Sequence, residues 1–140
     1  MKMDFHWNHP VSQIAYERSG GDQGRLFLAN ESKRLMDPYV PARNLVLAQN
    51  VRTYVRNQHG YVHYTSPYAH YQYEGILYVS SRTGSAWASM GEHKIKTGRK
   101  LTQDKSRHPL ATSHWDKAML TARRDDLVQS YQRWLKRRGA

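Results

Sequence analysis

Histidine is the residue type with the clearest capacity for chemistry in this chain, because neutral imidazole is a common metal ligand. The eight histidines include five candidate ligands: His59, His63, His70, His108 and His114. His63 and Glu74 could be neighbours across a turn. A zinc site usually shows close pairs such as His-Glu-x-x-His or Cys-x-x-Cys. Neither pattern occurs and the chain has no cysteine, so we expect no metal and no other cofactor.

Catalytic motifs are also missing from the sequence. It contains no Gly-x-Gly-x-x-Gly, no P-loop and no Gly-x-Ser-x-Gly. The acidic residues are scattered, which gives little support to a hydrolase with paired carboxylates. Glu74, between Tyr73 and Gly75, is the one carboxylate in a tyrosine-rich stretch, and we expect it to form a hydrogen bond or an ion pair within the fold. The sequence therefore predicts a protein that is not an enzyme.

The charge points to a polyanionic partner. The chain has 22 basic and 11 acidic residues, a formal net charge of +11. Such an excess fits nucleic acid, an acidic protein face or a membrane surface, and the plainer alternative is solubility. The sequence has no apolar run of 18 residues, so we expect no membrane span. The N-terminus lacks the apolar region of a signal peptide. The absence of cysteine fits a protein made in a reducing cytoplasm.

Residues 80–113 are rich in basic and small polar residues, and we interpret them as an extended basic arm. Within it, residues 94–102 predict a hairpin whose turn lies near Thr97 and Gly98. A solvated loop is the alternative. The predicted contacts of this arm with DNA or an acidic partner are Lys94, Lys96, Arg99, Lys100, Lys105 and Arg107.

Residues 62–79 predict a strand, a short helix and a second strand. Ser66 is the expected N-cap with Pro67 at the first helical position, and Gly75 is expected to end the helix. The helix carries three tyrosines, Tyr68, Tyr71 and Tyr73. A phenol ring with a polar tip suits both a packed core and a subunit interface.

The remaining pattern predicts one domain at residues 21–140, preceded by an arm at residues 1–20. A helix is expected from Arg25 to Met36, with Asp22 as a possible N-cap. Residues 45–56 fit either a strand or a helix; we expect a strand from about Val51, and a short helical piece before it is an open alternative. Asn57 to Gly60 predicts a hairpin turn that leads into a partner strand at residues 61–65.

The clearest predicted helix covers residues 114–138, with a capping box formed by Ser113 and Asp116. Its apolar residues form two faces, displaced by roughly 160° at 100° per residue. The first comprises Trp115, Ala118, Met119 and Ala122, and the second Leu127, Val128, Tyr131, Trp134 and Leu135. Either the helix breaks near residues 123–126, or its second half contacts another subunit. We prefer the second alternative and predict an interface at Leu127, Tyr131, Trp134 and Leu135, together with the three central tyrosines.

Three segments resemble the minor capsid and tail-completion proteins of long-tailed bacteriophages. They are MDPYVP at 36–41, TSPYAHYQYEG at 65–75, and HPLA at 108–111 followed by WDKAM at 115–119. They occur in the order found in that family. One departure is Asn44, where the family usually has glycine; asparagine tolerates the left-handed conformation well.

The resemblance implies a structural protein of the head–tail connector, located in the neck of the virion after assembly in the host cytoplasm. It implies a homo-oligomeric ring, with a hexamer as the preferred stoichiometry. The implied partners are portal, adaptor or head-closure proteins, tail tube proteins and packaged DNA. The expected fold is α+β: an N-terminal helix, an antiparallel sheet of about four strands and a C-terminal helix on the sheet. The alternative function is that of a small cytoplasmic protein that binds nucleic acid without sequence preference.

Overall fold

A computed structural model of the 140-residue chain describes residues 12–41, 46–85, 92–103 and 105–139. The fold is α+β, as the sequence predicts. Predictions for residues 1–11 and for Asn44 lie outside the described residues. The helices are α1 (Ser12–Arg18), α2 (Gly21–Met36), the 3-10 helix η1 (Asp37–Tyr39), α3 (Val46–Gln49), α4 (Ala69–Glu74) and α5 (Trp115–Arg138). The strands are β1 (Val51–Arg56), β2 (His59–Tyr64), β3 (Ile76–Ser80) and β4 (Lys94–Lys100).

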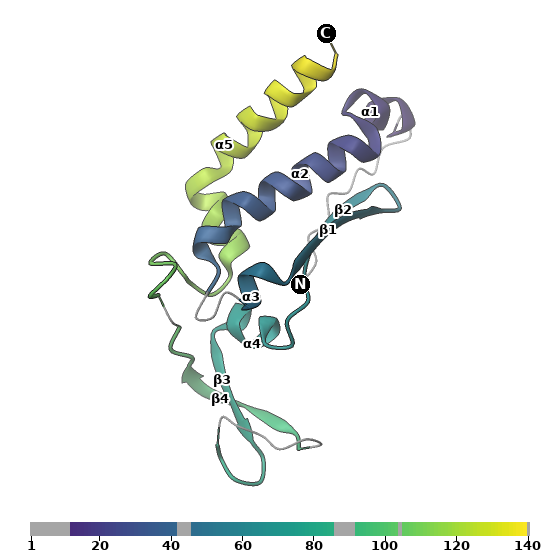
Figure 1. Ribbon diagram of the computed structural model, residues 1–140. Coiled ribbons are helices and arrows are strands. Elements are labelled where there is room, and N and C mark those ends of the chain that lie inside the picture. Colours follow the sequence, from purple (N-terminus) through teal and green to yellow (C-terminus); the bar gives the residue numbers. More distant parts are fainter. Residues whose placement is uncertain (1–11, 42–45, 86–91, 104, 140) are drawn as a thin grey trace.

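Helix α2 is the central layer of the body, with α5 along one side and the β1–β2 hairpin along the other (Figure 1). It buries Ala29, Leu35 and Met36 in the core. It begins four residues earlier than the predicted helix, and its N-cap is Gly20 at φ 100°. Asp22 does not cap the helix; it accepts a hydrogen bond from the Tyr16 hydroxyl of α1. Part of the expected N-terminal arm is therefore helical and packs on α2.

The β1–β2 hairpin follows the predicted turn. Asn57 and Gln58 both have positive φ, 51° and 65°, which suits the tight twist of a two-residue hairpin. Strand β1 begins at Val51, as expected, and pairs antiparallel with β2. Along β2 the buried residues alternate, and Val62 and Tyr64 face α2.

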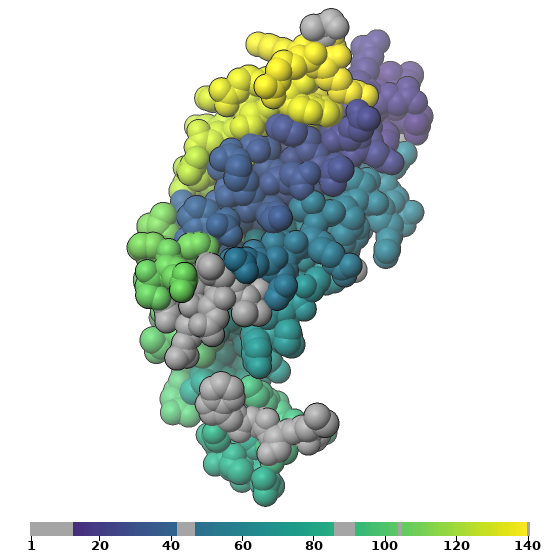
Figure 2. All heavy atoms as spheres, viewed as in Figure 1, coloured from purple at the N-terminus to yellow at the C-terminus, as the bar shows by residue number. Residues whose placement is uncertain are grey.

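Strands β3 and β4 form a second two-stranded sheet, so the chain has two hairpin ribbons in place of the predicted single sheet. The predicted turn near Thr97 and Gly98 is wrong, because residues 94–100 form one strand paired with β3. The Thr97 hydroxyl donates to the Leu77 carbonyl at 2.6 Å, where the register is irregular. The local pattern of a hairpin was therefore outweighed by pairing with β3, which is more distant in sequence. Figures 1 and 2 show this ribbon as a narrow extension at the end of the body opposite the C-terminus.

The ends of α4 and α5 differ from the expected caps. Tyr68 is the N-cap of α4, while the Ser66 hydroxyl accepts a hydrogen bond from the Tyr68 amide at 3.2 Å. Gly75 ends α4 at φ 69°, as predicted. The capping box of α5 is wrong: the N-cap is His114 at φ 49°, without a side-chain cap. Asp116 instead accepts a hydrogen bond from the Tyr73 hydroxyl, which joins α5 to α4.

The core centres on Trp115, which is fully buried, and it brings the three resemblance segments together. Rings of Tyr64 and Tyr73 lie edge-on to Trp115, with centroids 5.3 and 5.1 Å away. The His114 amide donates to the Tyr73 carbonyl at 2.9 Å. His108 Nδ1 donates to the carbonyl of the buried Val40 at 2.7 Å. The three segments therefore define the packing of the fold rather than a ligand site.

Candidate interaction surfaces

The C-terminal half of α5 packs on its own chain. The helix is kinked at Arg123, whose φ is −129°, so the first of the two alternatives for the displaced faces is confirmed. Leu127 is buried, the Tyr131 hydroxyl donates to the Ser19 carbonyl, and Trp134 stacks on Phe27 at 5.2 Å.

The preference for a subunit contact rested on the premise that one helix cannot place both faces on one core, and the kink removes that premise. Leu135, in the same half of α5, is half-buried, and Val128 is exposed. Contact of Leu127, Tyr131, Trp134 or Leu135 with another subunit stays a prediction.

The three central tyrosines have different environments. Tyr73 belongs to the core edge, where burial and the 2.9 Å hydrogen bond to Asp116 raise the pKa of Tyr73 to about 12. Tyr68 is 55% exposed. Tyr71 is half-buried on the surface of α4. Of the three, Tyr68 and Tyr71 are available to a partner, and their contact with a subunit stays a prediction.

Tyr71 belongs to a cluster where α4 meets the β3–β4 ribbon, formed by His70, Tyr71, Glu74, Tyr78 and Lys94. The Tyr71 and Tyr78 rings lie 4.8 Å apart, and Lys94 Nζ lies 5.2 Å from the Tyr71 ring centroid. The Tyr78 hydroxyl donates to Glu74 at 2.7 Å; this bond lowers the pKa of Glu74 and raises the pKa of Tyr78. The cluster fixes the root of the ribbon, and it confirms the hydrogen-bonding role expected of Glu74.

The basic residues of the predicted arm lie on and after β4. Lys96 pairs with Tyr78 in register and Lys94 with Ser80. Ile95, between them, is 52% exposed. The other four predicted contacts are exposed: Arg99, Lys100, Lys105 and Arg107. Five of the six predicted cations are therefore exposed and Lys94 is half-buried beside Tyr71, and what they contact stays a prediction.

The histidines that the structure describes do not converge on a metal site. Among the described residues, no group of three or more His, Cys, Asp or Glu side chains could hold a metal ion. Glu74 is 3.5 Å from His70, and the predicted neighbour His63 lies on β2 opposite Arg52. His114 contacts the Tyr73 ring at 4.7 Å, and His108 bonds Val40. His108 and His114 therefore take part in packing within the fold.

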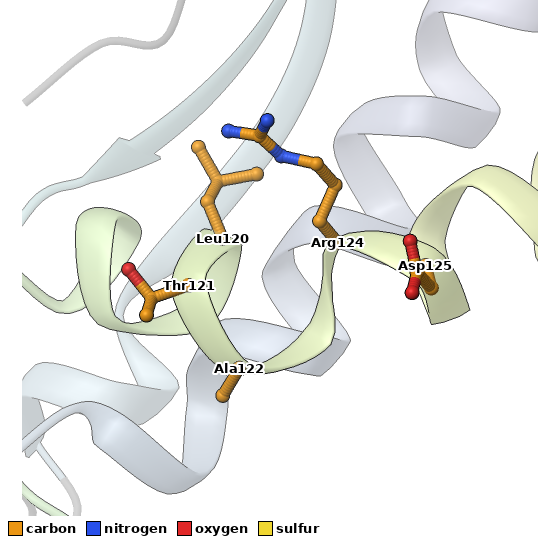
Figure 3. A pocket seen from close by; sticks show the side chains of 5 residues that line it. All are labelled: Leu120, Thr121, Ala122, Arg124 and Asp125. Atoms are coloured by element: carbon orange, nitrogen blue, oxygen red, sulfur yellow. The ribbon is translucent and has the colours of Figure 1, made fainter.

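A pocket of about 370 Å³ lies beside the kink of α5 (Figure 3). Its lining comes from one helix: Leu120, Thr121, Ala122, Arg124 and Asp125. Leu120 and Arg124 extend to the same side in Figure 3, away from Ala122. Nothing in this lining forms a nucleophile–base pair. In the described part of the chain, no helix has both the length and the apolarity to cross a membrane.

One surface was not predicted from the sequence: the face of the β1–β2 hairpin turned away from α2. It carries Arg52, Tyr54 and Arg56 on β1, paired in register with His63, Tyr61 and His59 on β2. The Asn57–Gln58 turn could have revealed it, because a two-residue loop fixes the register and places directly opposite residues on one face.

Comparison with known protein families identifies the class of protein to which this chain belongs. The chain matches a family model described as minor capsid protein over residues 11–138. It therefore belongs to this family of bacteriophage virion proteins, as the three segments predict. No curated protein and no solved structure matches it.

Proposed function

We propose that this minor capsid protein is a subunit of the head–tail connector, forming a ring in the virion neck between the portal and the tail. Its partners are further copies of itself, portal-side adaptor or head-closure proteins, and tail tube proteins. A hexamer is the first stoichiometry to test. Its work is binding and geometry, without catalysis. Membership of a virion family argues against the alternative of a nucleic-acid binder that acts outside the virion.

The observation that carries this proposal is the projecting β3–β4 ribbon. An isolated two-stranded hairpin is marginally stable in water, so it gains from packing on another surface. Residues Ile76, Leu77 and Tyr78 of β3 are only half-buried, and Ile95 of β4 is 52% exposed. A ribbon with apolar residues left at the surface is suited to insertion between neighbouring subunits.

A ring also requires two different patches on each subunit, because head-to-tail contacts are heterologous. The ribbon supplies one patch, with Ile95 between Lys94 and Lys96. The second patch must lie on the body of the neighbour. The cluster at the root of the ribbon, with Tyr71 and Tyr78 in contact, keeps the ribbon at a fixed angle to the body. Preorganisation of this kind lowers the ordering cost of association.

The test is the mass of the purified protein, alone and mixed with portal or tail tube proteins, at low and moderate salt. A discrete ring, or a monomer that joins a ring only with those partners, supports the proposal. A persistent monomer that joins neither partner contradicts it.

A matched pair of variants locates the contact. Ile95→Gln removes the exposed aliphatic side chain of the ribbon, and Val128→Gln removes one of similar exposure, 46%, from α5. We expect the first to weaken assembly about four- to tenfold, since full burial of an isoleucine contributes about 1.5–3 kcal/mol and about half of this side chain is still exposed. The second should leave assembly unchanged. Equal effects of the two would argue against the ribbon as the contact.

A further inference from the structure

The outer face of the β1–β2 hairpin presents two exposed cations, Arg52 and Arg56, on one strand. Register places Arg52 opposite His63, Tyr54 opposite Tyr61, and Arg56 opposite His59. Opposite residues share a face, and Val62 and Tyr64 are buried on the other face, so these six side chains lie on the side away from α2. In Figure 1 the hairpin forms the outer layer on its side of α2.

The two arginines on β1 are the charged groups of this face that can bind a ligand. Arg52 and Arg56 are both exposed, and within the described chain neither forms an ion pair. The β2 side chains His59, Tyr61 and His63 take part in other interactions, which leaves Arg52 and Arg56 as the groups that can bind a ligand. Residues 38–73 contain no aspartate or glutamate, and the local charge is therefore positive.

Tyrosine rings hold one of the arginines in place. The Tyr54 and Tyr61 rings stack across the two strands at 5.1 Å, and the Arg56 guanidinium lies 5.7 Å from the Tyr54 ring centroid. Cation–π contact of this kind restrains the side chain while leaving its N–H groups free to donate. Arg52 and Arg56 lie four positions apart on β1, about 13 Å, so the two guanidinium groups can each donate to a different phosphate.

From this geometry we infer that the outer face of β1–β2 binds the phosphate backbone of DNA without reading sequence. The face carries two exposed arginines and no aliphatic side chain. Guanidinium groups donate well to phosphate oxygens. The inference concerns a different surface from the basic β4 segment, and in a connector it would identify the side of the subunit that meets the passing genome.

The test compares two double variants of the full chain that both lower the formal net charge from +11 to +9. One is Arg52→Gln with Arg56→Gln on the hairpin face. The other is Arg99→Gln with Lys100→Gln, also exposed, on β4. Binding to two short DNA duplexes of unrelated sequence is measured by fluorescence anisotropy from about 50 to about 200 mM salt.

We expect the wild-type chain to bind both duplexes equally, with affinity falling steeply as salt rises. The hairpin variant should reduce the slope of log K against log salt by about two, because each lost phosphate contact removes about 0.9. The β4 variant should change the slope by less than half as much. Equal loss in both variants would reduce the effect to net charge and overturn the inference, as would a wild-type chain that does not bind DNA.

Two further readouts separate this inference from the connector proposal. Urea unfolding of the hairpin variant should change little, because both arginines are exposed, make no ion pair in the described chain, and only Arg56 loses an exposed cation–π contact. Ring assembly should also be unchanged. A hairpin variant that binds DNA normally but loses stability or assembly shows that the face contacts protein, which overturns the inference and leaves the ring proposal intact. Failure of assembly in the wild type bears on the ring alone.

Discussion

Replacing Trp134 by alanine should destabilise the isolated subunit, because the ring of Trp134 packs inside its own chain. Trp134 is half-buried, stacks on Phe27 at 5.2 Å and covers Gly20. A β-carbon at Gly20 would lie 2.5 Å from the Trp134 ring. The contact is close enough that removing the ring leaves a gap between α5 and α2.

The magnitude follows from burial and ring geometry. Truncating a fully buried tryptophan to alanine costs about 3–5 kcal/mol, and a half-buried ring contributes about half of that. The stack on Phe27 adds about 0.5–1 kcal/mol. We therefore expect the free energy of unfolding to fall by about 2–3 kcal/mol, and the melting temperature to fall by about 10 °C.

The assay is urea unfolding followed by circular dichroism at several protein concentrations, with Val128→Ala as the control. Val128 lies on the same half of α5 and is 46% exposed, so its truncation should cost less than about 0.5 kcal/mol. Loss of stability in Trp134→Ala should not depend on protein concentration. If the variant unfolds like the wild type at low concentration and loses only assembly, then Trp134 is a subunit anchor and the intrachain reasoning is refuted.

Two other predictions concern backbone approach and pH. Gly60→Ala should destabilise the fold by about 1–3 kcal/mol, since its β-carbon would lie 2.7 Å from the Arg25 carbonyl oxygen of α2; Gly98→Ala, with no atom within 4 Å, should not, and equal urea midpoints would refute this. The raised pKa of Tyr73, about 12 against 10.0, makes the folded state hold its proton more tightly. That stability is fully present below pH 10 and is lost as pH rises to 12, by about 1 kcal/mol after allowance for partial exposure. Tyr73→Phe should flatten urea stability over this range, and an unchanged profile would contradict the assignment.

Local signals in the sequence determined much of the fold. The α+β class, the hairpin turn at Asn57, the start of β1 at Val51 and the end of α4 at Gly75 were all predictable. Each depends on the φ preference or the side-chain pattern of a few neighbouring residues. Family membership was also predictable, because the motif segments are contiguous in sequence.

Long-range pairing decided what the sequence misjudged. Residues 94–100 have the pattern of a local hairpin, but the bond from Thr97 to Leu77 commits them to β3. Asp116 has the spacing of a capping box with Ser113, but its carboxylate accepts a hydrogen bond from the Tyr73 hydroxyl instead. In both cases the hydrogen-bond partner lies 20 or more residues away in sequence, so no local sequence pattern can reveal it.

The sequence by itself determined the charge, the family and the periodicity of each element, since these reside in neighbouring residues. Only the tertiary structure decided where the two apolar faces of α5 go. A kink at Arg123 lets Trp115 fill the core and Trp134 cover α2 within one chain. It also decided which cations share a surface, because Arg52 and Arg56 face the same way only once β1 is paired and its other face is buried against α2.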